Sequence, residues 1–236
     1  GQDTIREAVT SWNTSIDTLE FGVGIGPGDV TVSQANNGND LVLKIAGTAD
    51  QVTILNTIQY GDWRVDRVTF TDGTIWTHSD LMAKSMLANT GNDTFYGDEG
   101  ANTLSGGDGN DALDGRNGDD ILIGGAGNDI LSGSAGADTY RFNLGDGQDT
   151  IREAGASWNN ATDTLEFGSG IGPSNVKVTK ASNGTDLILE IIGTSDKVTL
   201  VNTLLNTDWR VDQVKFVNGV VWTHSDMVQL ADNANS

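Results

Sequence analysis

The chain has 236 residues, no cysteine, and 33 Asp and Glu against 13 Lys and Arg, which gives a formal net charge of −20. This charge argues against nucleic acid and anionic lipid as partners, because both need a basic surface, and it favours cations. Thirty-one glycines and only two prolines, with many β-branched residues, are typical of an all-β protein, and no stretch approaches the ~20 apolar residues of a membrane span.

The sequence contains a long duplication with an offset of 146 residues. Gly1–Ala8 recurs as Gly147–Ala154, and the match continues without a gap through the motifs DTLEF, DWRVD and WTHSD, with about 50 of the first 82 residues identical. Residues 1–87 and 147–233 are therefore two copies of one module. Because residues 147–153 also close a central repeat block, we place the domains at 1–87 (copy 1), 88–153 (the repeat block) and 154–236 (copy 2).

Copy 1 predicts short strands separated by turns. NNGND at 36–40 and TDG at 71–73 are hairpin signals, and Ser79-Asp80 can cap a short helix through Leu87. The expected strands are Thr18–Phe21, Val30–Gln34, Leu41–Ile45, Gln51–Asn56, Asp66–Thr71 and Thr74–Thr77. Copy 2 repeats this scheme, and each copy is expected to stack on an end of the central block and to cover its open edge.

Residues 88–141 form six consecutive nine-residue frames. They read ANTGNDTFY, GDEGANTLS, GGDGNDALD, GRNGDDILI, GGAGNDILS and GSAGADTYR, on the pattern G-G-x-G-x-D-x-U-x with U a large apolar residue. Each frame combines a six-residue turn, in which glycine supplies positive φ, with a three-residue strand. The strand places position 8 inward, at Phe95, Leu104, Leu113, Leu122, Leu131 and Tyr140.

Two frames make one coil of a flattened roll, so that the turns alternate between two edges and residues 18 apart stack. The first edge carries Asp93, Asp111 and Asp129 and continues at Asp149, which comes two residues late. The second edge carries Asn102, Asp120 and Asp138.

Stacked carboxylates repel, at a cost on the order of 3 kcal/mol per pair for a separation of ~5 Å and an effective dielectric of about 20. A divalent ion between them reverses the sign. Ca²⁺ suits such a gap, because it accepts six to eight carboxylate and carbonyl oxygens in flexible geometry, whereas Zn²⁺ prefers His or Cys. The pattern therefore predicts several calcium ions, about three to five, and Asn102 weakens its site because an amide oxygen carries no charge.

The block at 88–153 resembles the nonapeptide repeats of the repeats-in-toxin proteins, also called haemolysin-type calcium-binding repeats. The flanking modules resemble the haemolysin-type calcium-binding protein-related domain through DTLEFG-x-GIGP, DLVL or DLIL, V-D-x-V-x-F and G-x-x-W-T-H-S-D. The resemblance implies an all-β fold, in which a calcium-stabilised parallel β-roll is flanked by two homologous small β modules.

In that family each ion lies between turns two frames apart and is held by position-6 side chains and turn carbonyls. The resemblance implies an ion between Asp111 and Asp129 with the carbonyls near Gly107, Gly109, Gly124 and Ala126, and an ion between Asp120 and Asp138 with those near Arg116, Gly118, Gly133 and Ala135. Asn89, Asp98, Arg116 and Ser134 stand where glycine is usual at position 2, so these turns are expected to be strained.

The resemblance also implies export by type I secretion and folding outside the cell or at its surface, where calcium is millimolar. The expected partners are calcium ions and other modules of the same long chain. Because the sequence begins in mid-motif, we expect a further nonapeptide block upstream of Gly1.

Three functions compete. The first is a non-catalytic calcium-binding spacer or cap in an exported adhesin or toxin. The second is a carbohydrate-binding adhesin module that uses Trp12, Trp63 and Trp76 and their copy-2 counterparts Trp158, Trp209 and Trp222, although core packing is the simpler role for them. The third is an appendage of a secreted enzyme, whose catalytic domain would have to lie outside this sequence, because no catalytic motif is found. His78 and His224 have no partner motif and are expected to pack or cap, and Arg64 with Asp66 and Arg210 with Asp212 to form local ion pairs.

Overall fold

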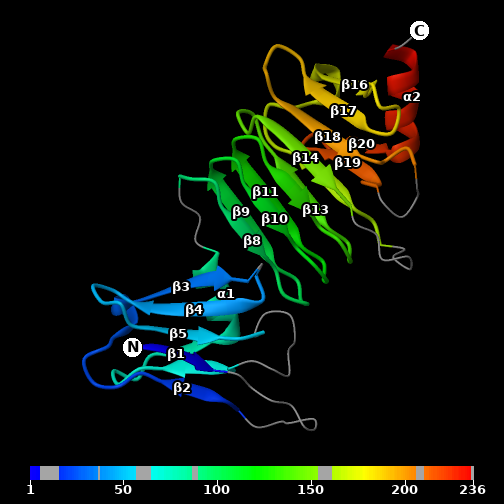
Figure 1. Ribbon diagram of the computed structural model, residues 1–236. Helices are drawn as coiled ribbons and strands as arrows, with labels where there is room; N and C mark the ends of the chain where they lie inside the picture. The colour runs from blue at the N-terminus through cyan, green and yellow to red at the C-terminus, as the bar shows by residue number, and fades with distance from the viewer. Residues whose placement is uncertain are drawn as a thin grey trace. The chain divides into compact units, whose positions relative to one another are not determined.

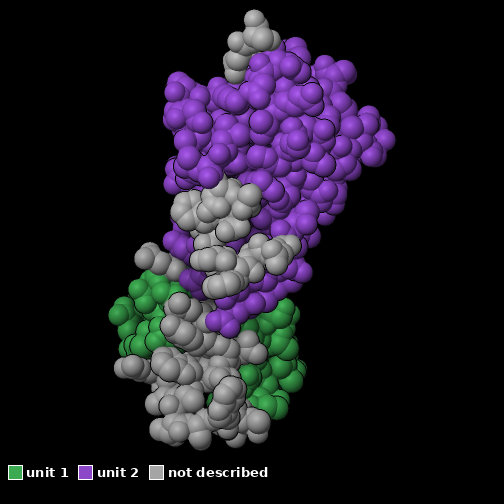
Figure 2. Space-filling view, turned by 90° about the vertical axis from the view of Figure 1, so that its right-hand side faces the viewer, with its two compact units in different colours: residues 1–87 green, residues 88–236 purple. Residues whose placement is uncertain are grey.

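The fold is described from a computed structural model that covers residues 1–5, 16–36, 38–56, 65–86, 90–153, 161–205 and 210–234. The chain divides into two compact units, residues 1–87 and 88–236, which are coloured separately in Figure 2. Strands dominate both units, and neither described helix has the length and apolar character that a membrane span requires.

Unit 1 is made of two small sheets and a helix. The larger sheet has the order β1-β5-β4-β3, in which β1 and β5 are parallel and the other pairs antiparallel, and the smaller has the order β2-β6-β7. The elements are β1 (Gln2–Ile5), β2 (Thr18–Glu20), a 3-10 helix (Pro27–Asp29), β3 (Val30–Ala35), β4 (Asp40–Ile45), β5 (Gln51–Ile54), β6 (Arg67–Thr69), β7 (Ile75–Thr77) and α1 (His78–Ser85). The six strands expected in copy 1 are confirmed with small shifts of their ends.

The start of helix α1 differs from the prediction. Thr77, rather than Ser79, is the N-cap: its hydroxyl accepts the Asp80 N–H at 3.2 Å, while the Asp80 carboxylate accepts the Thr77 N–H at 2.8 Å. This reciprocal capping box satisfies two N–H groups that would otherwise lack partners. The helix ends at Ser85, and Leu87 lies outside the described residues.

Unit 2 contains the nonapeptide frames and copy 2 in two continuous sheets (Figure 1). Their orders are β16-β17-β18-β14-β12-β10-β8 and β20-β19-β15-β13-β11-β9. The elements are β8 (Thr94–Tyr96), β9 (Thr103–Asp108), β10 (Ala112–Asp114), β11 (Ile121–Ala126), β12 (Ile130–Ser132), β13 (Thr139–Phe142), β14 (Gln148–Arg152), β15 (Thr164–Phe167), a 3-10 helix (Pro173–Asn175), β16 (Val176–Lys180), β17 (Leu187–Ile191), β18 (Lys197–Val201), β19 (Gln213–Phe216), β20 (Val221–Thr223) and α2 (His224–Ala234).

Alternate frames lie in opposite sheets, as a two-frame coil requires. Strands β8, β10 and β12 pair in parallel in one sheet and β9, β11 and β13 in the other, each with the register of residues 18 apart. The position-8 side chains between the sheets are at most 7% exposed, so the inward ladder is confirmed. Strands β8, β10 and β12 have the expected three residues, whereas β9 and β11 continue into the turn and have six.

Copy 2 continues the roll without a break in hydrogen bonding. Strand β14 pairs in parallel with β12 on one side and with β18 of copy 2 on the other, and β15 lies likewise between β13 and β19. Residue 153 therefore marks the end of the repeat block in the sequence, but it does not mark a break in the fold, because both sheets continue into copy 2. In copy 1 the counterparts of β14 and β15 are β1 and β2, which stand at the edges of their sheets within unit 1.

Candidate calcium site

The position-6 residues form two stacked rows, one on each edge of the roll. On the first edge the N–H groups of Asp93, Asp111 and Asp129 donate to Oδ1 of the next carboxylate, at 2.7, 2.7 and 3.0 Å, and the last acceptor is Asp149. On the second edge the N–H groups of Asn102 and Asp120 donate to Asp120 and Asp138 at 2.7 and 2.8 Å. The sequence-predicted rows, including the late position of Asp149, are thus brought together.

In five of the stacked carboxylates only one oxygen has a hydrogen-bond partner among the described residues. The Oδ2 atoms of Asp111, Asp120, Asp129, Asp138 and Asp149 are buried and have no hydrogen-bond partner among the described residues. All five residues are at most 2% exposed. An ionised carboxylate is costly to bury without a counter-charge, so this row of oxygens requires either protons or cations.

The pKa values of these carboxyls reflect the same cost. Burial raises the pKa of Asp120 and Asp149 to about 8 and that of Asp129 and Asp138 to about 6, against the ordinary 3.8. Backbone N–H donors oppose the rise, and neighbouring carboxylates of the same row add to it for Asp120, Asp129 and Asp149.

Two frame positions are glycine for steric reasons. A Cβ at position 1, for example at Gly124, would overlap the Oδ2 atom of Asp129 in the same frame. A Cβ at position 4, for example at Gly127, would overlap the carbonyl oxygen of Gly109 one coil away, and the φ of Gly127 is +155°. These positions bring backbone and carboxylate oxygens closer together than any side chain allows.

Position 2 tolerates larger residues at a conformational cost. Arg116 and Ser134 take φ of 71° and 75°, where Gly107 and Gly125 in the equivalent positions take 93° and 99°. The left-handed region is unfavourable for residues that carry a Cβ, so the expected strain is present at Arg116 and Ser134. Asp98 does not take a positive φ, so the strain expected there is absent, and Asn89 lies outside the described residues. The Arg116 guanidinium lies 5.3 Å from the Tyr96 ring centroid, a cation–π contact that offsets part of this cost.

Several of the predicted carbonyl ligands already take part in the ladder. The carbonyls of Ala126 and Ala135 accept the N–H groups of Gly109 and Gly118, at 2.8 and 2.7 Å, and the Arg116 carbonyl accepts the N–H of Ala135 at 2.8 Å. A carbonyl oxygen has a second lone pair, so these hydrogen bonds leave room for a metal. Gly107 and Gly124 lie in the turns of the first edge that contain Asp111 and Asp129, and Gly133 lies in the turn of the second edge that contains Asp138.

The first two turns of the roll are less buried than the later ones. Asp93 and Asn102 are only half-buried. The Asn102 amide is engaged with Asp98, since its Oδ1 accepts the Asp98 N–H at 2.7 Å and its Nδ2 donates to the Asp98 carboxylate at 3.1 Å. Both ends of the Asn102 amide are therefore hydrogen-bonded within its own turn, and its weaker hold on calcium stays a prediction.

Sequence reasoning missed the continuation of the second edge into copy 2. The Asp138 N–H donates to Asp163 Oδ1 at 2.9 Å, and the Asp163 N–H donates to Asp212 Oδ2 at 3.0 Å. The signal was available, because Asp138 and Asp163 each precede a threonine and an inward apolar residue, as Asp93 and Asp149 also do. The spacing changes from 18 to 25 and then to 49 residues, which hides the row from a search for a fixed period.

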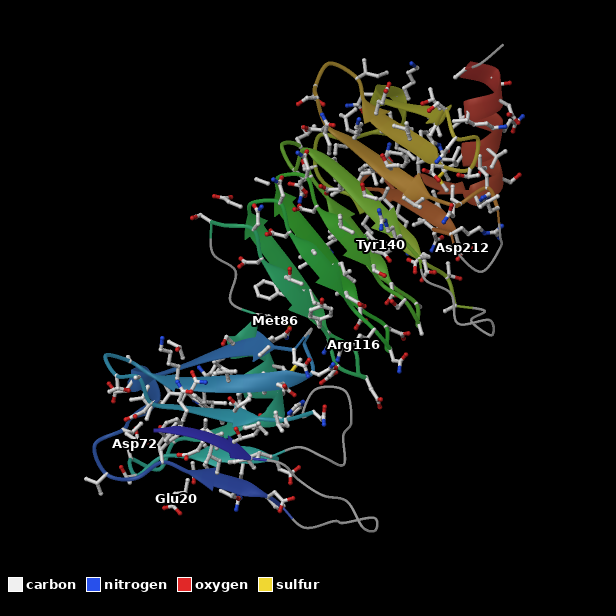
Figure 3. All side chains as sticks on the ribbon, viewed as in Figure 1. Glu20, Asp72, Met86, Arg116, Tyr140 and Asp212 are labelled. Atoms are coloured by element: carbon white, nitrogen blue, oxygen red, sulfur yellow. The ribbon has the colours of Figure 1, made fainter. Side chains whose placement is uncertain are left out.

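A buried Glu also lies beside this row. Glu153 is 8% exposed and accepts a hydrogen bond from the hydroxyl of Tyr140, which in turn accepts the Gly133 N–H at 2.6 Å. Figure 3 labels Tyr140 on the roll and Asp212 in copy 2. Burial, with the nearby Asp163, raises the pKa of Glu153 to about 9, and burial raises that of Asp163 to about 7.

The donor set fits Ca²⁺. Both rows offer carboxylate and carbonyl oxygens, and the rows contain no nitrogen or sulfur ligand of the kind that Zn²⁺ prefers. Flexible six- to eight-fold coordination suits a stack in which successive turns repeat but are not identical. The five unpartnered Oδ2 atoms are the observation that favours a resident cation.

The two tryptophans that the structure describes take part in packing. Trp76 and Trp222 each meet a phenylalanine edge-on, Phe70 and Phe216 respectively, with ring centroids 4.7 Å apart. The four other tryptophans, Trp12, Trp63, Trp158 and Trp209, lie outside the described residues.

The histidines and the described arginine of these motifs are held by a hydrogen bond, by burial or by an ion pair. The ring of His224 is hydrogen-bonded through Nε2 to the Thr203 carbonyl at 2.9 Å, and His78 is buried at the start of α1. Arg210 and Asp212 form the expected ion pair at 3.1 Å, whereas Arg64 lies outside the described residues.

Comparison with known proteins agrees with this architecture. Residues 87–122 and 114–151 match the family described as RTX calcium-binding nonapeptide repeat (4 copies), and residues 40–80 and 186–226 match the haemolysin-type calcium binding protein related domain. No match was found among curated proteins.

Two solved structures show similarity to the chain. The extracellular lipase LipA from Serratia marcescens is 21% identical over 84% of this chain and 33% of the lipase, with a TM-score of 0.39. The AlgE6R3 subunit of the Azotobacter vinelandii mannuronan C5-epimerase is 30% identical over 48% of this chain and 72% of the subunit, with a TM-score of 0.36. The chain thus spans about a third of the length of the lipase.

Fold and site together define a calcium-binding β-roll protein. Residues 87–151 belong to the RTX calcium-binding nonapeptide repeats, and the modules before and after them in the sequence each contain a haemolysin-type calcium binding protein related domain.

Proposed function

We propose that this chain is a calcium-triggered structural module of an exported protein, in which ion binding folds the roll into a rigid spacer and copy 2 caps its end. The observation that supports it best is the set of five buried, unpartnered carboxylate oxygens in two stacked rows. This role is binding and structural rather than catalytic.

The proposed ions lie in the gaps between successive members of each row. The first edge offers three gaps, between Asp93, Asp111, Asp129 and Asp149, and the second offers two, between Asn102, Asp120 and Asp138. In the inner gaps the ligands are the Asp carboxylates with carbonyls near Gly107, Gly109, Gly124 and Ala126 on one edge and Arg116, Gly118, Gly133 and Ala135 on the other. The outer gaps at Asp93 and Asn102 bind more weakly, so three to five ions are expected.

Folding and binding are one event in this proposal. Without the ion, each row places ionised or protonated carboxyls in a buried position, and a single ladder of apolar side chains must hold the two sheets together. An ion that binds only the folded state shifts the equilibrium towards it by mass action. A chain that stays unfolded at low calcium and folds at millimolar calcium suits export in an unfolded form followed by folding outside the cell.

The capping role is supported by strand pairing. The end of a stacked roll exposes unpaired backbone groups, and β18 and β19 of copy 2 pair with β14 and β15 at this end. Antiparallel strands β16, β17 and β20 then follow at the outer edges, and α2 packs against β16. Copy 2 thereby ends the parallel stack with antiparallel strands and a helix.

Calcium titration by calorimetry, followed in parallel by far-ultraviolet circular dichroism, tests the central proposal. We expect β structure to appear together with the uptake of three to five ions, and to be lost in chelator. Full β structure in excess chelator with no uptake at millimolar calcium would refute it.

A matched pair of substitutions tests the cap. Leu200 in copy 2 and Ile54 in copy 1 are equivalent positions, each 1% exposed, and Leu200 pairs with Ile151 of β14. We expect Leu200→Asp to lower the calcium affinity of the roll more strongly than Ile54→Asp. Equal effects of the two substitutions would contradict a specific role of copy 2.

A further inference from the structure

Three buried carboxyl groups meet where the roll joins copy 2. Asp138 precedes β13, Glu153 follows β14, and Asp163 precedes β15, so each comes from a different segment of the chain. The three residues are 0%, 8% and 7% exposed. One ligand oxygen from each lies within 4.8 Å of the other two, which matches oxygens on opposite sides of a Ca²⁺ ion at about 2.4 Å.

The charged groups that act most strongly on the cluster are acidic. The charged groups that act on Glu153 are Asp163 and Asp138, and those that act on Asp163 are Asp138 and Asp212, all of them acidic. Hydrogen bonds satisfy part of the cluster: Tyr140 donates to Glu153, and the Asp138 N–H donates to Asp163. The Oδ2 atom of Asp138 has no hydrogen-bond partner among the described residues, and the Asp138 side chain is fully buried.

We propose that Asp138, Glu153 and Asp163 bind one further Ca²⁺ ion, at a site that shares only Asp138 with the nonapeptide turns. The all-oxygen donor set favours Ca²⁺ over Zn²⁺, and backbone carbonyls or water complete its coordination. This junction site extends the proposed calcium-dependent function, but Glu153 and Asp163 belong to no nonapeptide frame.

The ion would stabilise the packing of copy 2 against the roll. Asp138 is the last position-6 residue of the frames, whereas Asp163 opens the DTLEF motif of copy 2. Copy 1 carries the same motif, with Asp17 in the place of Asp163, and Asp17 is only half-buried in this chain. Because Asp138 belongs to the roll and Asp163 to copy 2, the site forms only when the two pack together.

The test compares bound calcium in the full chain and three variants, Glu153→Gln, Asp163→Asn and the matched control Asp17→Asn. Native mass spectrometry at saturating calcium counts the ions, and calorimetry gives their affinities. We expect one ion fewer for Glu153→Gln and for Asp163→Asn, with the remaining sites intact, and the wild-type number for Asp17→Asn.

An unchanged count and unchanged affinities in Glu153→Gln and Asp163→Asn would overturn the junction site while leaving the proposed function of the roll intact. A chain that binds no calcium at all would refute both. Should the variants fail to fold, wild-type crystals grown with Tb³⁺ decide the question: an anomalous peak among the three carboxylates supports the site, and its absence when the turns are occupied refutes it.

Discussion

Asp129→Asn should move the stability of the metal-free and calcium-loaded protein in opposite directions. Asp129 stands in the middle of the first edge: its Oδ1 accepts the Asp111 N–H, its own N–H donates to Asp149, and its Oδ2 has no partner among the described residues. Asparagine has nearly the same shape and keeps the Oδ1 acceptor, so the change removes charge with little change in packing.

The magnitude in the metal-free state follows from the pKa. Burial raises the pKa of Asp129 from 3.8 to about 6. A folded-state pKa higher by about 2 pH units means that ionised Asp129 destabilises the fold by up to about 3 kcal/mol at pH 7.5, above both values. Allowing for solvent screening at the edge of the roll, we expect Asp129→Asn to stabilise the metal-free protein by about 1–2 kcal/mol.

With calcium the sign reverses. The substitution removes a full negative charge from beside the two gaps that Asp129 shares, and the electrostatic attraction of a divalent ion for its ligands falls accordingly. We expect calcium affinity at these gaps to fall on the order of tenfold or more, and the midpoint of urea unfolding in calcium to fall with it.

Folding induced in chelator by a stabilising osmolyte measures the effect on the metal-free protein, and urea unfolding in millimolar calcium measures the effect on the loaded protein, both followed by circular dichroism. Asp108→Asn is the matched control, because Asp108 is an exposed carboxylate of the turn that precedes Asp111. It removes the same formal charge and should change neither stability by more than about 0.5 kcal/mol. A loss of stability of equal size in chelator and in calcium would refute the reasoning, since it would mean that Asp129 acts through packing alone.

Three further predictions concern the backbone, the core and pH. Gly127→Ala should destabilise the calcium-loaded protein by more than about 2 kcal/mol, because its Cβ meets the Gly109 carbonyl of the preceding coil. Gly145→Ala, at φ +93° with open space around it, should cost about 1 kcal/mol, and urea unfolding compares the two variants. Leu122→Ala, at 0% exposure, should cost about 2–5 kcal/mol, clearly more than Ile123→Ala at a half-buried position, and equal losses would argue against the inward ladder. Because burial raises the carboxyl pKa values to between about 6 and 9, the folded state binds more protons than the unfolded state above about pH 4, so the stability of metal-free protein should fall as pH rises from 4 to 9, while calcium affinity rises. Circular dichroism in metal-free buffer at pH 5 and pH 8 checks this, and more β structure at pH 8 would contradict it.

The amino-acid sequence alone determined the periodic part of this protein. A nine-residue period of glycine, aspartate and a large apolar residue specifies which side chains face inward and which carboxylates stack, because the geometry of one frame repeats in the next. The inward ladder from Phe95 to Tyr140 and the row from Asp93 to Asp149 could therefore be predicted from spacing. Asp149 could also be assigned to this row from the sequence, although it comes two residues late, because an insertion of two residues hardly disturbs the period.

Tertiary structure decided what happens where the period ends. The pairing of β14 with β18 and of β15 with β19 joins residues 49 apart, and only the folded sheets show that copy 2 extends the roll. For the same reason Asp163 and Glu153 come to lie beside Asp138, although nothing in their local sequence marks a shared site. A local pattern records the contacts that repeat along the chain, whereas a contact made once across a long connection depends on the whole fold.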